Sequence, residues 1–307
     1  MAKEESQVER NESESMDEVQ PQKRKWLKDP DELPKFVRIS LTILADTITF
    51  LNFASGVTAI VLSVIFFIDP TKVILSLWAA RLILLAIIFD FTDGIPARLA
   101  KKNPGFFGTV VDSAADTVSF GFAPMVMIAL SMQLTNTEST AHFVLAICSV
   151  IVGVYFGFCT TFRLVRFTKT PSKKWFQGIP SPSAGCAVAV YIIIKLYIEN
   201  KVGSSAIATP IVGLLFMIMA ATMMIVKVRY PTTKLPKNFL EVFLLGLAAI
   251  VIVTLAVMPF DYIVYPAGIM AVLTMFYILY GPFYLVTHML ERAKKVDDYK
   301  LPDNKDF

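Results

Sequence analysis

The chain is organised as a succession of long apolar runs separated by short polar connections. Most runs contain roughly 20 residues or more, enough for a helix to cross a hydrocarbon core about 30 Å thick. The pattern therefore predicts an all-α, polytopic membrane protein with about eight transmembrane helices. The expected spans are residues 43–67, 73–98, 109–132, 142–166, 183–199, 206–226, 238–258 and 262–288.

Lysine and arginine are abundant in every second connection, and this alternation predicts how the chain crosses the membrane. The connection after the second run contains Arg98, Lys101 and Lys102, whereas residues 133–141, after the third run, contain neither residue type. The following connections continue to alternate between many and few Lys and Arg residues up to the C-terminus. Because short basic connections stay in the cytoplasm, both termini are expected there, with the protein in the cell membrane.

Composition supports a membrane protein and narrows its partners. Apolar residues make up 55% of the 307 residues, charged residues 18%, and the mean hydropathy is +0.60. A net charge of +4 is expected from cytoplasmic loops facing anionic lipid, so membrane lipid is an expected partner and nucleic acid is not. Cys148, Cys159 and Cys186 lie in or beside apolar runs without CxxC spacing, which indicates neither a disulfide framework nor a zinc site.

Three segments are expected along the chain. Residues 1–34 are rich in Glu, Gln, Lys and Ser, and they predict a disordered cytoplasmic tail because they hold too little apolar surface to fold alone. A regulatory or partner-binding role is the alternative for this tail. Residues 35–290 are expected to form the membrane domain, and residues 291–307 a cytoplasmic C-terminal tail.

Four aspartates carry the most informative chemistry of the sequence. Asp90 and Asp93 are three residues apart at the expected cytoplasmic end of the second span, and Asp112 and Asp116 are four apart at the start of the third. Each spacing puts its pair on one helix face. Four carboxylates in a small volume repel one another unless cations are bound, and hard oxygen ligands without His or Cys favour Mg²⁺ or Mn²⁺. The pattern therefore predicts two divalent ions at the cytoplasmic edge of the membrane, suited to phosphoryl chemistry.

Small and basic residues surround these acids. Gly94, Ala97 and Gly108 let helices approach closely or leave room for a flat nucleotide. Arg98 is expected to pair with phosphate or to serve as a basic loop charge. A cation transporter would also gather acids in the membrane, but its acids are expected near the midplane rather than at the edge.

Residues 90–116 read Asp-x2-Asp-Gly-x2-Ala-Arg-x9-Gly-x3-Asp-x3-Asp, which closely resembles the signature of the CDP-alcohol phosphatidyltransferase family. This resemblance implies that Asp90, Asp93 and Asp112 bind two divalent ions together with the pyrophosphate of a CDP-linked lipid, and that Asp116 is the general base. Metal ligation can be shared by all four acids. It also implies that the nucleotide site is lined by Gly94, Ala97, Arg98 and Gly108.

Further segments resemble the phosphatidylserine synthase branch of this family and imply L-serine as the acceptor. They are residues 112–124, 163–167, 178–185 and 229–234. Arg163 and Arg166, three apart on one helix face, are candidates to bind phosphate or the serine carboxylate.

Several alternatives stay open at this point. Glycerol 3-phosphate or inositol phosphate would be other acceptors for the same chemistry, and divalent-cation transport is the rival from another class. The expected lipid donor is CDP-diacylglycerol or its ether-linked counterpart CDP-archaeol. With CDP-archaeol, the product would be an archaetidyl lipid. The family resemblance further implies a homodimer.

Overall fold

The structure is a computed structural model that describes residues 34–100, 106–132, 140–169, 176–202, 208–226, 228–230 and 239–300. All but the last residue of the expected N-terminal tail, residues 1–34, and the last seven residues of the chain lie outside the described residues. The principal helices are α3 (Lys35–Ile68), α4 (Val73–Leu99), α5 (Phe106–Thr117), α6 (Ala123–Ala129), α7 (Thr140–Lys169), α8 (Ser181–Val202), α9 (Ala208–Ile225), α10 (Phe239–Val257) and α11 (Val264–Lys300). Within the expected C-terminal tail, residues 291–300 continue α11.

The all-α membrane fold expected from the apolar runs is confirmed. Among the described residues, six helices are long and apolar enough to cross a membrane, namely all or part of α3, α4, α7, α8, α9 and α11. The other two expected spans coincide with α10 and with the region from α5 to α6. A total of eight spans, with both termini in the cytoplasm, stays a prediction.

The third expected span is interrupted. Between α5 and α6 the chain forms a five-residue π-helix, η2 (Val118–Phe122). Pro124, two residues beyond it, has no backbone N–H with which to continue the α-helical hydrogen bonds. A locally wider turn accommodates such a residue. The interruption falls two residues after Asp116, so it lies at the boundary of the candidate chemistry.

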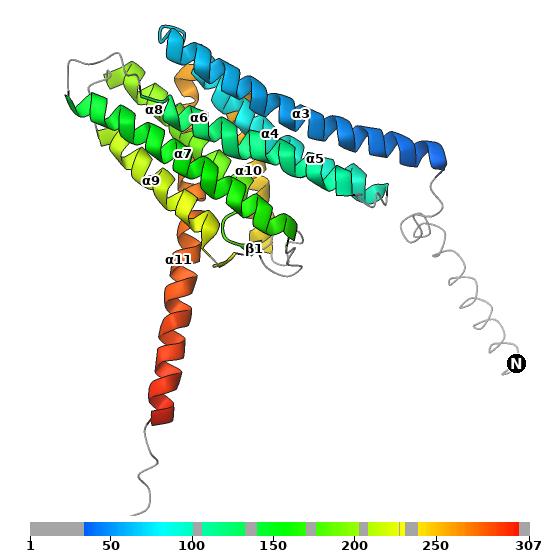
Figure 1. Cartoon of the computed structure of the whole chain (residues 1–307), viewed down its shortest axis with the longest axis vertical. Coiled ribbons are helices and arrows are strands. Elements are labelled where there is room, and N and C mark those ends of the chain that lie inside the picture. Colours follow the sequence, from blue (N-terminus) through cyan, green and yellow to red (C-terminus); the bar gives the residue numbers. More distant parts are fainter. Residues whose placement is uncertain are drawn as a thin grey trace, which may run out of the picture.

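The helices form one bundle in which α8 is central. Figure 1 shows α3 lying along α4 and α5, while α7 and α9 lie side by side on another face. Most residues of α8 between Ser181 and Leu196 are buried, because α4, α9 and α11 all pack against it. Large apolar side chains on α3, α7 and α11 are exposed from the bundle, as expected for surfaces that face lipid.

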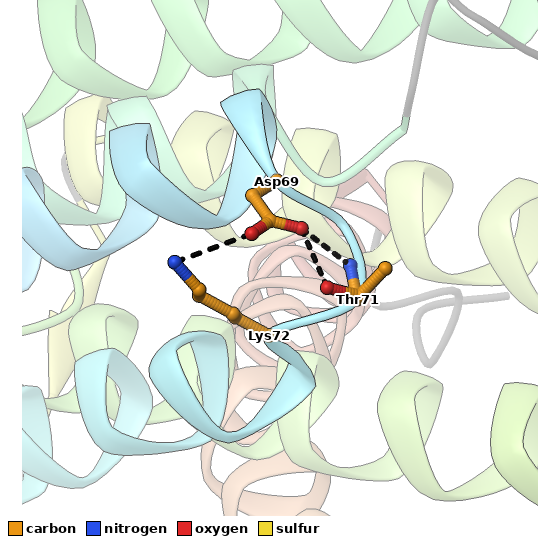
Figure 2. A network of polar contacts seen from close by, with 3 residues as sticks. All are labelled: Asp69, Thr71 and Lys72. Atoms are coloured by element: carbon orange, nitrogen blue, oxygen red, sulfur yellow. Dashed lines mark hydrogen bonds and ion pairs between the residues drawn. The ribbon is translucent and has the colours of Figure 1, made fainter.

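A short polar turn joins α3 to α4. Figure 2 shows Asp69 accepting hydrogen bonds from the backbone N–H of Thr71 at 3.2 Å and from its hydroxyl at 2.6 Å, and forming an ion pair with Lys72 at 3.2 Å. The Thr71 hydroxyl and then Lys72 hold the pKa of the Asp69 carboxyl below its ordinary value. This turn lies at the end of the bundle opposite the four acids.

A two-stranded sheet, which the sequence did not predict, ties two loops together near the C-terminal ends of α7 and α9. Strand β1 (Phe176–Gln177) pairs antiparallel with β2 (Arg229–Tyr230). Gly178 follows with a φ of 80°, and an added Cβ there would meet the carbonyl oxygen of Met224. Only glycine suits this combination of positive φ and close backbone approach. Segments 178–185 and 229–234, which both resemble the family branch, thus begin side by side, and residues 231–234 lie outside the described residues.

Candidate active site

The C-terminal part of α4, which contains Asp90 and Asp93, and the second half of α5, which contains Asp112 and Asp116, bring the predicted acids near one another. The side chains of Asp90 and Asp116 lie within hydrogen-bonding range of each other. Asp112 lies within electrostatic range of Asp90, Asp93 and Asp116. Asp93 is buried, with 9% of its surface exposed, whereas Asp112 is exposed. Two helices therefore place Asp90 beside Asp116, with Asp93 and Asp112 within electrostatic range.

The donor set fits a hard divalent cation without forming a complete ligand shell. Within the described ranges, no three His, Cys, Asp or Glu side chains lie close enough to constitute a ready-made metal site. However, the Asp90 and Asp116 carboxyl groups are in contact, and two such groups repel when both are ionised unless a proton or a cation lies between them. Oxygen donors of this kind are those preferred by Mg²⁺ and Mn²⁺.

Two polar residues of α3 hold the acids from the opposite side. The Thr49 hydroxyl donates to Asp93 Oδ2 at 3.0 Å, and Asn52 Nδ2 donates to Asp116 Oδ1 at 3.1 Å. Both donors lie on one face of α3 because they are three residues apart. Sequence reasoning missed them, although a polar amide within an apolar span is costly and was a signal of function.

Helix α3 and the third expected span approach each other closely at η2. The Ser119 hydroxyl donates to the backbone carbonyl of Asn52 at 2.7 Å. A Cβ added at Gly56 would lie 2.6 Å from Ser119 Oγ and 2.7 Å from its Cα, so only a glycine permits this crossing. The contact fixes the register of Asn52 relative to Asp116.

The guanidinium group of Arg163 is a buried cation close to Asp90 and Asp116. It is 6% exposed, its Nη1 donates to the hydroxyl of Ser181 at 2.9 Å, and it interacts electrostatically with Asp90 and Asp116. Its Nε is buried and has no hydrogen-bond partner among the described residues. A cation with an unused donor next to carboxylates can receive an anionic group of a ligand.

Arg166, one helical turn further along α7, makes a different contact. Its Nη1 donates to the carbonyl oxygen of Ile225, the last residue of α9, at 2.8 Å. An arginine in this place satisfies a helix C-terminus, which leaves backbone carbonyls without intrahelical partners. The structure therefore brings Arg163 to the acids and connects Arg166 to α9.

The residues expected to line the nucleotide lie along the same two helices. Gly94, directly after Asp93, and Ala97, one turn further along α4, are half-buried, and Gly108 is half-buried in the first turn of α5. The backbone of Arg98 belongs to α4, and its side chain is outside the described part of the structure.

Comparison with known proteins supports the same family resemblance over a longer part of the chain. The sequence profile described as CDP-alcohol phosphatidyltransferase matches residues 42–227, which is more than half of the chain. A CDP-diacylglycerol–serine O-phosphatidyltransferase of Methanocaldococcus jannaschii is 31% identical over 70% of this chain and 86% of that protein. An archaetidylserine synthase of Methanothermobacter thermautotrophicus is 28% identical over 62% of this chain and 71% of that protein.

A bacterial relative shows similar coverage. The CDP-diacylglycerol–serine O-phosphatidyltransferase of Helicobacter pylori strain J99 is 28% identical over 71% of this chain and 82% of that protein. No solved structure matches the chain significantly.

Proposed function

Because the chain belongs to the CDP-alcohol phosphatidyltransferase family, we propose that it transfers a phosphatidyl-type group from a CDP-linked lipid to L-serine and releases CMP. The observation that supports this function best is the contact of Asp116 with Asp90 beside the buried Arg163. It combines a base, metal-type ligands and an anion-binding cation in one place. The names of the relatives and the matching branch segments support serine as the acceptor.

In the proposed reaction, the serine hydroxyl oxygen attacks the phosphorus that carries the lipid. A new oxygen–phosphorus bond forms, the bond from that phosphorus to the oxygen of CMP breaks, and CMP leaves. Asp116 accepts the hydroxyl proton as general base. Arg163, close to Asp116, binds the carboxylate of serine through its free Nε edge and so orients the hydroxyl.

Asp90, Asp93 and Asp112 would hold divalent metal, with Asp116 available to share in ligation, and dependence on such metal is general in the family. Two bound Mg²⁺ or Mn²⁺ ions would neutralise the pyrophosphate charge and stabilise CMP as a leaving group. Thr49 keeps Asp93 oriented toward this site through its hydroxyl. Gly94, Ala97, Arg98 and Gly108 would line the path of the cytidine nucleotide.

The lipid donor is CDP-diacylglycerol or CDP-archaeol, since both present the same pyrophosphate to the acids. Relatives named for ester-linked and for ether-linked lipids are found at similar identity, which leaves both donors as candidates. We place the acids on the cytoplasmic side of the cell membrane, where CMP departs into water. A homodimer is part of the same proposal through family membership.

The decisive experiment follows CMP release by purified protein in detergent. CDP-diacylglycerol and an ether-linked CDP-lipid are each supplied with Mg²⁺ or Mn²⁺ and with serine, glycerol 3-phosphate or inositol phosphate. Serine-dependent CMP release is expected, with its loss in EDTA and recovery on adding metal. CMP release only with another alcohol would identify that alcohol as the acceptor. Divalent-metal flux by the protein reconstituted into sealed vesicles, without CMP release from any donor, would contradict the transferase.

Variants of the acids test their assigned roles. Asp93→Asn and Asp116→Asn are expected to lower kcat by at least about 100-fold, because each removes a charge on which metal binding or proton transfer depends. Size-exclusion profiles identical to that of the unaltered protein control for folding. Full activity in either folded variant would refute the assignment.

A further inference from the structure

Asn52 is a buried amide within the first membrane-spanning helix. None of its surface is exposed, and its Nδ2 donates to Asp116 Oδ1 at 3.1 Å. A carboxamide in an apolar helix is unfavourable unless it is matched by a specific partner. The partner here is the carboxylate assigned as general base.

The orientation of the amide follows from its partner. If the amide were turned over, its oxygen would face a carboxylate oxygen, and two acceptors repel, so the N–H side must face Asp116. The outward Oδ1 is buried and has no hydrogen-bond partner among the described residues. An amide retained only for packing is usually satisfied at both ends. Asn52 is therefore matched to Asp116 rather than to the surrounding core.

A second bond anchors the same residue from the backbone. The Ser119 hydroxyl donates to the Asn52 carbonyl at 2.7 Å, and Ser119 lies three residues after Asp116. Gly56 allows this approach because it has no side chain. One stretch of the third span, residues 116–119, is thus bound both to the side chain and to the backbone of Asn52.

We propose that Asn52 is a positioning residue that sets the orientation of the Asp116 carboxyl relative to the acceptor hydroxyl. This role rests on the proposed transferase function, in which Asp116 removes the hydroxyl proton. Asn52 leaves the chemistry to Asp116 and acts by restricting rotation of its carboxyl group. Asp90 alone would hold that group from the α4 side.

The test compares Asn52→Ala and Asn52→Leu with the unaltered full-length protein in the CMP-release assay. We expect kcat to fall about 10- to 100-fold, because misplacing the Asp116 carboxyl by about 1 Å can cost that much. The KM of serine and the KM of the CDP-linked lipid are each expected to change less than about threefold. The loss is expected to persist at saturating Mg²⁺ or Mn²⁺. Ser63→Ala is the matched control, because Ser63 is also buried on α3 and its hydroxyl donates to the carbonyl of Ala59 in the same helix.

A second variant covers the case in which Asn52 substitutions prevent folding. Ser119→Ala removes the backbone anchor with little change in volume and is expected to lower kcat about three- to tenfold. A kcat within twofold of the unaltered protein in a folded Asn52 variant, or in Ser119→Ala if neither Asn52 variant folds, would overturn the role. A change confined to the KM of serine would also overturn the role, and so would a loss of kcat that added metal reverses. Absence of serine-dependent CMP release from the unaltered protein would instead refute the proposed function.

Discussion

At the scale of single residues, two arginines of α7 make different contacts. Arg163 is buried beside Asp90 and Asp116 and keeps its Nε unbonded within the described residues, whereas Arg166 donates to the last carbonyl of α9. The sequence presents them as an equivalent pair because they share a helix face. Only the packing of α9 and α8 against α7 distinguishes their partners.

This difference leads to a paired prediction for acceptor binding. Arg163→Ala is expected to raise the KM of serine by at least about tenfold, because a charge-assisted hydrogen bond contributes about 1.5–3 kcal/mol. Arg166→Ala is expected to lower the thermal midpoint by a few degrees and to change that KM less than about threefold. Steady-state kinetics and thermal unfolding in detergent measure both. An equal rise of the KM of serine in the two variants would indicate that Arg166 also binds the acceptor.

The residues of the site were predictable from sequence to different degrees. The four aspartates could be found because charged residues at helical spacing stand out in apolar runs, and the structure brings Asp90 and Asp116 into contact. Thr49, Asn52 and Ser181 could not be assigned partners, since their partners lie on other helices. A hydrogen bond across 64 positions of sequence, such as that from Asn52 to Asp116, depends on how the helices cross.

At the scale of elements, the crossing of α3 with η2 is the contact on which the site geometry depends. Most expected spans agree closely with the helices, because apolar runs indicate the membrane-embedded part of a helix, but α3 begins eight residues earlier and α11 ends twelve residues later than expected. The π-helical interruption and the β1–β2 pair were not predictable in this way. Both arise from local backbone geometry, including the missing N–H of Pro124 and the positive φ of Gly178.

The crossing can be tested by adding one methyl group. Gly56→Ala is expected to destabilise the protein by about 1–3 kcal/mol and to lower kcat, because the new Cβ would overlap Ser119 and displace Asn52 from Asp116. Gly268→Ala on α11 is the control, since a Cβ there meets nothing within 4 Å among the described residues, and the change is expected to be neutral or to stabilise by up to about 1 kcal/mol. Thermal unfolding and CMP release are measured on both. Normal stability and activity of Gly56→Ala would contradict the tight crossing.

At the scale of the whole molecule, the arrangement of basic connections predicts an orientation that the bundle alone does not establish. The acids, the β1–β2 pair and the C-terminal ends of α7 and α9 share one end, and the Asp69 turn lies at the other. Whether the interrupted region from α5 to α6 crosses the bilayer decides the number of crossings between α3 and α8.

Cysteine labelling distinguishes these topologies. Lys35 and Lys201 are exposed at the start of α3 and the end of α8, so five crossings between them would place them on opposite sides. In a background without native cysteines, an impermeant maleimide is expected to label Lys35→Cys but not Lys201→Cys in sealed inside-out vesicles. Labelling is expected to reverse from the outside of intact cells. Both variants reacting from one side would show that the α5–α6 region does not cross.

The length of α11 has a practical consequence for imaging this protein. At about 1.5 Å per residue, its 37 residues extend roughly 55 Å, well beyond a hydrocarbon core of about 30 Å. Figure 1 shows its C-terminal half projecting away from the bundle as an unbroken helix. A rigid helical protein fused in phase after Lys300 would inherit that direction, and would give a small membrane protein the asymmetric marker that particle alignment in electron microscopy requires.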